Sequence, residues 1–136
     1  MIPRFPVKKY MSSRILSAPP TANAREMARL MTAEVVGCLL IEQGGEFVGI
    51  VTETDLVTKV LGQNADPSTI TAGDIMSYPV ASIEDTASLE TAHEMMGGQR
   101  IRHLMVTHDG KPVGLISVRS LLDAAYDWAL QMKHQA

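Results

Sequence analysis

The stretch Gly49-Ile50-Val51-Thr52-Glu53-Thr54-Asp55-Leu56 occurs twice in this chain, the second time in altered form. Moved by 65 positions, it falls without a gap on Gly114-Leu115-Ile116-Ser117-Val118-Arg119-Ser120-Leu121. The match continues outward, since Tyr10-Met11-Ser12 falls on Ile75-Met76-Ser77. Self-similarity at a fixed offset is typical of tandem units that bury a continuous core only together. We therefore predict an N-terminal arm at residues 1–9, a first copy at 10–66 and a second copy at 67–136.

Each copy is predicted to have the order strand, helix, strand, strand, helix. A helix is indicated by apolar positions at i, i+3, i+4 and i+7, which are Ala24, Met27, Ala28 and Met31 in one copy and Leu89, Ala92, His93 and Met96 in the other. Each helix is followed by two strand-like runs around a glycine turn, Gln43-Gly44-Gly45 or Asp109-Gly110. Further helices are expected at 53–61 and 118–132, and short first strands near Ile15 and Val80. The fold class is therefore α/β (α+β), with two βαββα repeats that we expect to pack through their sheets around a pseudo-two-fold axis.

Composition narrows the possible functions. The chain has 136 residues, of which 46% are hydrophobic, and a net charge of −3, so no global positive field favours nucleic acid or anionic lipid. The longest apolar run, 35–41, is far shorter than the roughly 20 residues of a membrane helix. The N-terminus lacks the apolar region of a signal peptide. Cys38 is the single cysteine, and we expect it to be a core residue of a cytoplasmic protein.

The most informative polar pattern is Thr52-x-x-Asp55, placed where a strand should end and a helix begin. One interpretation is structural, because Thr and Asp three residues apart form a capping box at a helix start. The other is a ligand site, in which the Thr52 hydroxyl and the first helical N–H groups hold a phosphate and the Asp55 carboxylate accepts hydrogen bonds from two ribose hydroxyls. This pattern by itself leaves both interpretations open.

The second copy differs at the positions that matter for a ligand. It has Ser117-x-x-Ser120, so the hydroxyl is kept and the carboxylate is lost. It also carries cations, Arg100 and Arg102 with His103, where the first copy is apolar. Swap symmetry predicts that these cations meet Asp55 in one cleft and bind the phosphates of a nucleotide. A solvated strand end is the alternative explanation of the cations.

Three further expectations concern single residues. His93 falls on the predicted buried helix face and is expected in the core. Gly97-Gly98 is expected to end its helix as a C-cap. Trp128 lies on an apolar stripe of the last helix with Leu121, Ala125 and Met132, and we favour a contact between subunits. Neither a paired-histidine metal motif nor a nucleotide-loop or nucleophile motif occurs in the sequence.

The tandem pattern resembles a pair of cystathionine β-synthase (CBS) domains, known as a Bateman module. The likeness is carried by Gly49-Ile50-Val51-Thr52 with Asp55-Leu56, by Ile75-Met76-Ser77 with Val80 and Ser82, and by Arg102-His103-Leu104, and it covers about residues 10–132. The resemblance implies a module that binds an adenosine-containing ligand such as AMP, ADP, ATP, S-adenosylmethionine or NAD(H). It also implies regulation of a partner protein and a homodimer.

The resemblance assigns roles to particular residues. Thr52 and Asp55 match the ribose and phosphate pair, and Val80 with its neighbour Ser82 matches the segment that lines the adenine. Arg102 and His103, beside Arg100, match the phosphate-side cations. A second, weaker cleft is expected at Ser17, Ser117 and Ser120, where the family's acid is missing. Magnesium is expected only as a companion of ATP.

We therefore expect a nucleotide-sensing regulatory module in signal transduction, without catalysis of its own and without membrane or nucleic-acid partners. The alternative is an interaction module with vestigial clefts, whose function is dimerisation through the last helix. An enzyme fragment is disfavoured, because no catalytic barrel accompanies the repeats.

Overall fold

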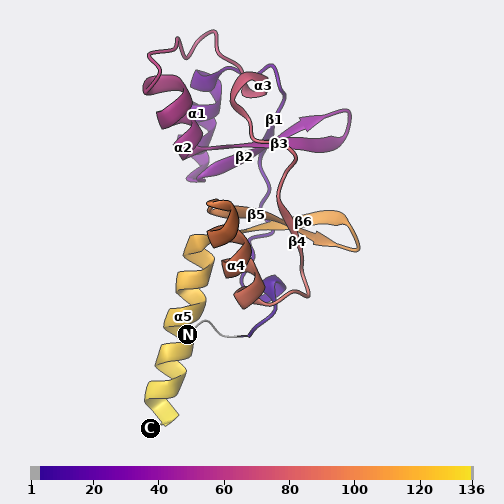
Figure 1. Cartoon of the computed structure of the whole chain (residues 1–136), viewed down its shortest axis with the longest axis vertical. Coiled ribbons are helices and arrows are strands. Elements are labelled where there is room, and N and C mark those ends of the chain that lie inside the picture. Colours follow the sequence, from indigo (N-terminus) through magenta and orange to yellow (C-terminus); the bar gives the residue numbers. More distant parts are fainter. Residues whose placement is uncertain (1–3, 136) are drawn as a thin grey trace. The chain divides into compact units, whose positions relative to one another are not determined.

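The fold was analysed in a computed structural model, which describes residues 4–135. The chain forms two compact units, drawn in Figure 1. One is continuous and runs from Ile15 to Val80; the other combines the chain up to Arg14 with the chain from Ala81 onward. We call them the continuous unit and the divided unit. The repeats have the predicted offset, but the units divide the chain at other points than 66/67, because residues 10–14 pack with the second repeat and 67–80 with the first.

The continuous unit has one three-stranded sheet and four helical segments. The sheet order is β1-β2-β3, with β1 parallel to β2 and β2 antiparallel to β3. Its elements are β1 (Ser17–Ala18), α1 (Ala24–Glu34), β2 (Cys38–Gln43), β3 (Glu46–Thr52), α2 (Glu53–Asp55), the π-helix η2 (Leu56–Leu61) and α3 (Ala72–Ile75).

The divided unit repeats this arrangement. Its sheet order is β4-β5-β6, again with one parallel and one antiparallel pairing. Its elements are the 3-10 turn η1 (Val7–Lys9), β4 (Ser82–Glu84), α4 (Leu89–Gln99), β5 (His103–His108), β6 (Lys111–Ser117) and α5 (Val118–Gln135). The predicted α/β class and the order strand, helix, strand, strand, helix are therefore confirmed in both repeats.

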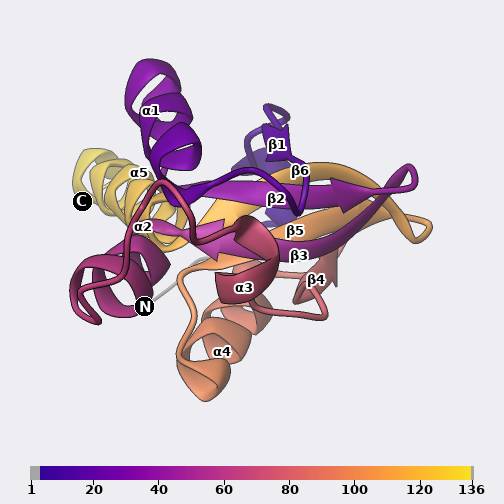
Figure 2. The same ribbon diagram turned by 90° about the horizontal axis from the view of Figure 1, so that it is seen from above.

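Both hairpin turns lie where the sequence places them. Gly44 and Gly45 have φ of 62° and 82°, and Asp109 and Gly110 have φ of 49° and 78°. Two successive positive φ values match the right-handed twist of the flanking strands. In both views the turn of the β2–β3 hairpin lies at the end of its unit away from α1 and α2 (Figures 1 and 2).

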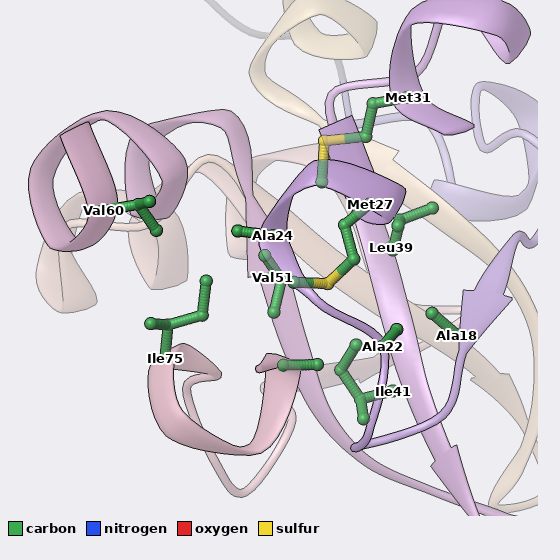
Figure 3. Packing of buried hydrophobic residues seen from close by; sticks show 11 residues of the cluster. Ala18, Ala22, Ala24, Met27, Met31, Leu39, Ile41, Val51, Val60 and Ile75 are labelled. Atoms are coloured by element: carbon green, nitrogen blue, oxygen red, sulfur yellow. The ribbon is translucent and has the colours of Figure 1, made fainter. Parts of the chain in front are cut away.

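The core of the continuous unit forms between α1 and the sheet. Figure 3 shows Met27 reaching from α1 toward Leu39 and Val51, with Val60 and Ile75 facing the same cluster. Leu39 and Val51 are completely buried and Met27 is 1% exposed. Cys38 is buried as predicted, and burial raises the pKa of its thiol to about 11, so it is an unreactive core residue.

The divided unit has its own core, which the N-terminal arm helps to build. Val7 is completely buried among residues that include Leu89, Leu104 and Ile116. The arm is also bound by its backbone, since the N–H of Val7 donates to Ala87 O at 2.7 Å and that of Lys8 to Asp85 O at 3.0 Å. Residues 4–9 are therefore part of a folded unit.

Two expectations about α4 are wrong. His93 is exposed, although Leu89, Ala92 and Met96 of the same helix are buried. The sequence pattern assigned one residue too many to the buried face of α4, because His93 lies at the edge of that face. Gly97 and Gly98 lie inside α4, and the left-handed residue that ends the helix is Arg100, with φ of 55°. The equivalent end of α1 is Val35, with φ of 54°.

The last helix is longer than predicted and runs to Gln135. Of its predicted apolar stripe, Leu121 is buried, Ala125 and Trp128 are half-buried and Met132 is 48% exposed. None of the helices within residues 4–135 combines the length and apolar character needed to cross a bilayer.

Candidate functional site

The centre of the candidate site is the turn from β3 into α2. Thr52 ends the strand in an extended conformation, and its hydroxyl accepts a hydrogen bond from Asp55 N at 3.3 Å. The Asp55 Oδ2 atom accepts in return from the Thr52 N–H at 2.9 Å and from the Thr52 hydroxyl at 3.2 Å. The predicted capping box is therefore present. Because the single proton of the Thr52 hydroxyl is already donated to Asp55, this hydroxyl can donate to a phosphate only after it rotates.

Asp55 is a nearly buried carboxylate, only 8% exposed. Burying a charge is costly unless it is paired and hydrogen-bonded. The partner is Lys59, whose Nζ lies 3.1 Å from Asp55 Oδ1. The same Nζ donates to the carbonyl oxygen of Ile75 at 2.8 Å. Lys59 thus links the carboxylate to the end of α3.

The sequence pattern did not identify Lys59 as a residue of the site. The signal for its pairing was available, since residues i and i+4 on a helix are neighbours and Asp55 and Lys59 have that spacing. Its bond to Ile75 O joins residues 16 apart and depends on the tertiary fold.

The segment after α3 is held close to the site by β3. Ile50 and Ser77 exchange two backbone hydrogen bonds, of 3.0 and 2.9 Å. A Cβ atom at Gly49 would press on the Sδ and Cγ atoms of Met76, so a larger residue here would require the Met76 side chain to move. The segment leads to Val80, which is half-buried. The continuous unit therefore brings Thr52, Asp55 and this segment to one end of its sheet.

Ser17, predicted for the second cleft, also belongs to the continuous unit. It lies exposed on β1, and its hydroxyl donates to Glu42 at 3.3 Å.

The divided unit carries the equivalent turn without an acid. The Ser117 N–H donates to Ser120 Oγ at 3.3 Å, and the two hydroxyl oxygens are 3.4 Å apart. Ser120 therefore makes only a weak capping contact at the start of α5 and supplies no carboxylate.

The predicted cations lie near this second turn in their own unit. His103 opens β5 opposite Ser117, and the Val118 N–H donates to the Arg102 carbonyl at 3.0 Å. Arg100 and Arg102 are exposed and His103 is half-buried. Ser82 is exposed on β4. The structure thus brings the cations together with Ser117 in the divided unit, whereas Asp55 belongs to the continuous unit.

The sequence pattern also did not predict a polar cluster at the β5–β6 turn of the divided unit. The Nδ1 of His108 lies 3.1 Å from Asp85 Oδ2, and this hydrogen bond, with the nearby acids Asp109 and Glu84, raises the pKa of the imidazole above 6.5. Glu84 accepts from the Asp109 N–H at 2.8 Å and from the Thr107 hydroxyl. These bonds close the β5–β6 turn, which is a structural role. Within residues 4–135, no three His, Cys, Asp or Glu side chains are placed to hold a metal ion.

Comparison with known proteins identifies the family. The CBS domain matches residues 7–62 and 72–127, and the chain belongs to this family as a tandem pair. An uncharacterised protein of Methanopyrus kandleri, MK0525, is 34% identical over 110 residues, which are 79% of this chain and 56% of that protein.

Solved structures agree on the fold. A Burkholderia ambifaria CBS-domain protein that is provisionally assigned to signal transduction is 30% identical, with a TM-score of 0.80 and 83% of each chain covered. A hexameric CBS-CP12 protein from bloom-forming cyanobacteria is 28% identical, with a TM-score of 0.81 over 87% of this chain and 69% of that one. The predicted family and fold are therefore confirmed.

Proposed function

We propose that this CBS pair is a regulatory module that binds an adenine nucleotide or a related adenosyl ligand, with the ribose on Asp55. AMP, ADP, ATP and S-adenosylmethionine are the candidate ligands. The observation that carries the proposal is the almost buried Asp55 carboxylate at the end of β3, which is held in place by its capping bonds. Among residues 4–135, its partners leave one acceptor position unused. A carboxylate whose orientation is already fixed suits a hydroxyl-rich ligand, because little further ordering of its side chain is needed on binding.

The other contacts follow from the sequence pattern. Arg100, Arg102 and His103 remain the proposed phosphate contacts, and Val80 with Ser82 the proposed adenine contacts. A second, weaker site at Ser17, Ser117 and Ser120 is expected to bind less well, because Ser120 offers no charge. Magnesium enters only with ATP.

Regulation would follow from differential binding. A ligand shifts a conformational equilibrium only by the difference in its affinity for the two states. We propose that the nucleotide favours one arrangement of the module and that a cytoplasmic partner protein responds to that arrangement.

The test uses two aspartates that cap helices in the same way. Asp74 forms a capping box with Thr71, with bonds of 2.9 and 3.0 Å, but it is exposed and lies outside the candidate site. Asp74→Ala should therefore lose about 1 kcal/mol of stability as a cap, and Asp55→Ala should lose at least as much, because it also removes the ion pair with Lys59. Only Asp55→Ala should lose the ability to bind the ligand.

Thermal unfolding is measured with each candidate ligand at millimolar concentration. A ligand at 100 times its Kd adds about 2.7 kcal/mol, which is a rise in Tm of roughly 6–12 °C for a chain of this size. We expect the rise in the wild type and in Asp74→Ala. No rise with any ligand, or an equal rise in Asp55→Ala, would reject the proposal.

A second candidate function is self-association, and the surface favours it. Val57 and Leu61 on η2 are 59% and 70% exposed, and the equivalent residues of α5, Leu122 and Tyr126, are 66% and 65% exposed. Exposed apolar pairs at matching places in both repeats suit an interface between copies, and the similar CBS-CP12 protein is hexameric. Light scattering of the wild type and of Leu61→Asp tests this; a monomeric wild type would reject it.

A further inference from the structure

We infer that Lys59 sets how strongly the site discriminates ribose from deoxyribose, because it competes with the ligand for Asp55. This inference rests on the proposed function, since it concerns the same carboxylate. It adds the residue that determines selectivity for the sugar.

The argument begins with the acceptor positions of Asp55. A carboxylate offers about four lone-pair positions. The Oδ2 atom uses two of them, for the N–H and the hydroxyl of Thr52. The Oδ1 atom uses one for Lys59, at 3.1 Å. Within the part of the chain that the structure describes, one position on Oδ1 is left for a ligand.

A ribose diol has two hydroxyl groups to donate, whereas a 2′-deoxyribose has one at these positions. The single remaining position satisfies the deoxy sugar without any change. As long as the Thr52 hydroxyl keeps its bond to Oδ2, the second hydroxyl of ribose is accepted only if Lys59 leaves Oδ1. When the wild type binds ribose instead of deoxyribose, it therefore gains one hydrogen bond and loses one ion pair. The free energies of these two changes nearly cancel.

The ammonium group of Lys59 is placed so that it can move away from Asp55 Oδ1. Its side chain is 43% exposed, compared with 11% for that of Asp55, so the ammonium group has access to water and the carboxylate has little. Its second bond, to Ile75 O, ties it to the segment that leads to Val80. Lys59 also lies in η2, a π-helix, a rare winding that often occurs at functional sites.

Lys59→Met tests the inference, because methionine keeps most of the length of the side chain and removes its charge and its N–H donors. Affinities for AMP and 2′-deoxyAMP, and for ATP and 2′-deoxyATP, are measured by calorimetry. Both members of each pair carry the same phosphates, so the ratio of their Kd values cancels the lost attraction between Lys59 and phosphate. We expect the wild type to prefer the ribonucleotide by no more than about threefold, and Lys59→Met by about tenfold or more, as for a hydrogen bond to a charged acceptor.

Two controls accompany the variant. Lys59→Arg keeps a cation beside Asp55 and should retain the weak preference. Lys111→Met removes a charge from the exposed start of β6 and should behave as the wild type. Lys59→Leu, which also cannot donate to Asp55, is the substitute if thermal unfolding shows that Lys59→Met is not folded.

The outcomes separate the two proposals. Equal ratios in the wild type and Lys59→Met would reject the role of Lys59 and leave the proposed function standing, and so would a tenfold preference already present in the wild type. No binding of any of the four nucleotides to the wild type or to Lys59→Met, together with no rise in Tm of the wild type with ADP or S-adenosylmethionine, would reject both.

Discussion

Val7→Ala should destabilise the divided unit and leave the continuous unit unchanged. Val7 is completely buried against residues more than 70 positions away, including Leu89 and Leu104. The substitution removes two methyl-sized groups, worth about 0.8 kcal/mol each in transfer free energy. The residual cavity adds to this loss. We expect a total of about 2–3 kcal/mol.

Native-state hydrogen exchange measures the two units separately. The amides of Leu104 and Val106 in β5 should exchange at least about thirtyfold faster in Val7→Ala, since 1.4 kcal/mol corresponds to a factor of ten. The amides of Leu39 and Ile41 in β2 should keep their rates. The exposed neighbour gives the control, Lys8→Ala, which should change stability by less than about 0.5 kcal/mol. Unchanged exchange in β5, or equal acceleration in both sheets, would refute the reasoning.

Three other predictions concern local geometry and charge. Gly114→Ala should lower the free energy of unfolding in urea by about 2–3 kcal/mol, because its Cβ would lie 2.5 Å from the backbone carbonyl oxygen of Ser12. Gly49→Ala should lower it less, because the new Cβ meets the movable side chain of Met76. Val35→Gly should raise stability by about 0.5–1 kcal/mol, since Val35 is 88% exposed with φ of 54°; a lower Tm would contradict this. The raised pKa of His108 means that its pair with Asp85 stabilises the protein below pH 6.5 and that this contribution is lost as the pH rises through the pKa of the folded state. Wild-type stability should therefore fall more than that of Asp85→Asn between about pH 6 and pH 8, and parallel pH profiles would contradict the assignment.

The features that the sequence predicts well are local ones. The turn at Asp109-Gly110 and the capping box at Thr52 each depend on residues within four positions of one another, so a short pattern is sufficient. The helix ends were harder to predict. Gly97-Gly98 suggested a C-cap, but the helix continues to Arg100, and the equivalent residue of the first repeat, Val35, is not glycine either.

The unit boundaries show a more general limit. A repeat in a sequence fixes its period but not its phase, because any window of 65 residues contains one complete copy. The phase is decided by packing, here by Val7 in one core and by Ile75 in the other. The contact between Lys59 and Ile75 O could not be predicted from the sequence for the same reason, since no sequence pattern in either segment indicates the other.

The division of one unit between the two ends of the chain affects its synthesis on the ribosome. Residues 15–80 emerge as a complete unit, whereas the arm that contains Phe5, Val7 and Met11 is made before its sheet exists. At about 5–20 residues per second, the hundred or so residues between the arm and β6 take on the order of 5–20 s to make. During that interval these apolar side chains lack their final partners, so the nascent chain exposes an apolar segment that a chaperone can bind.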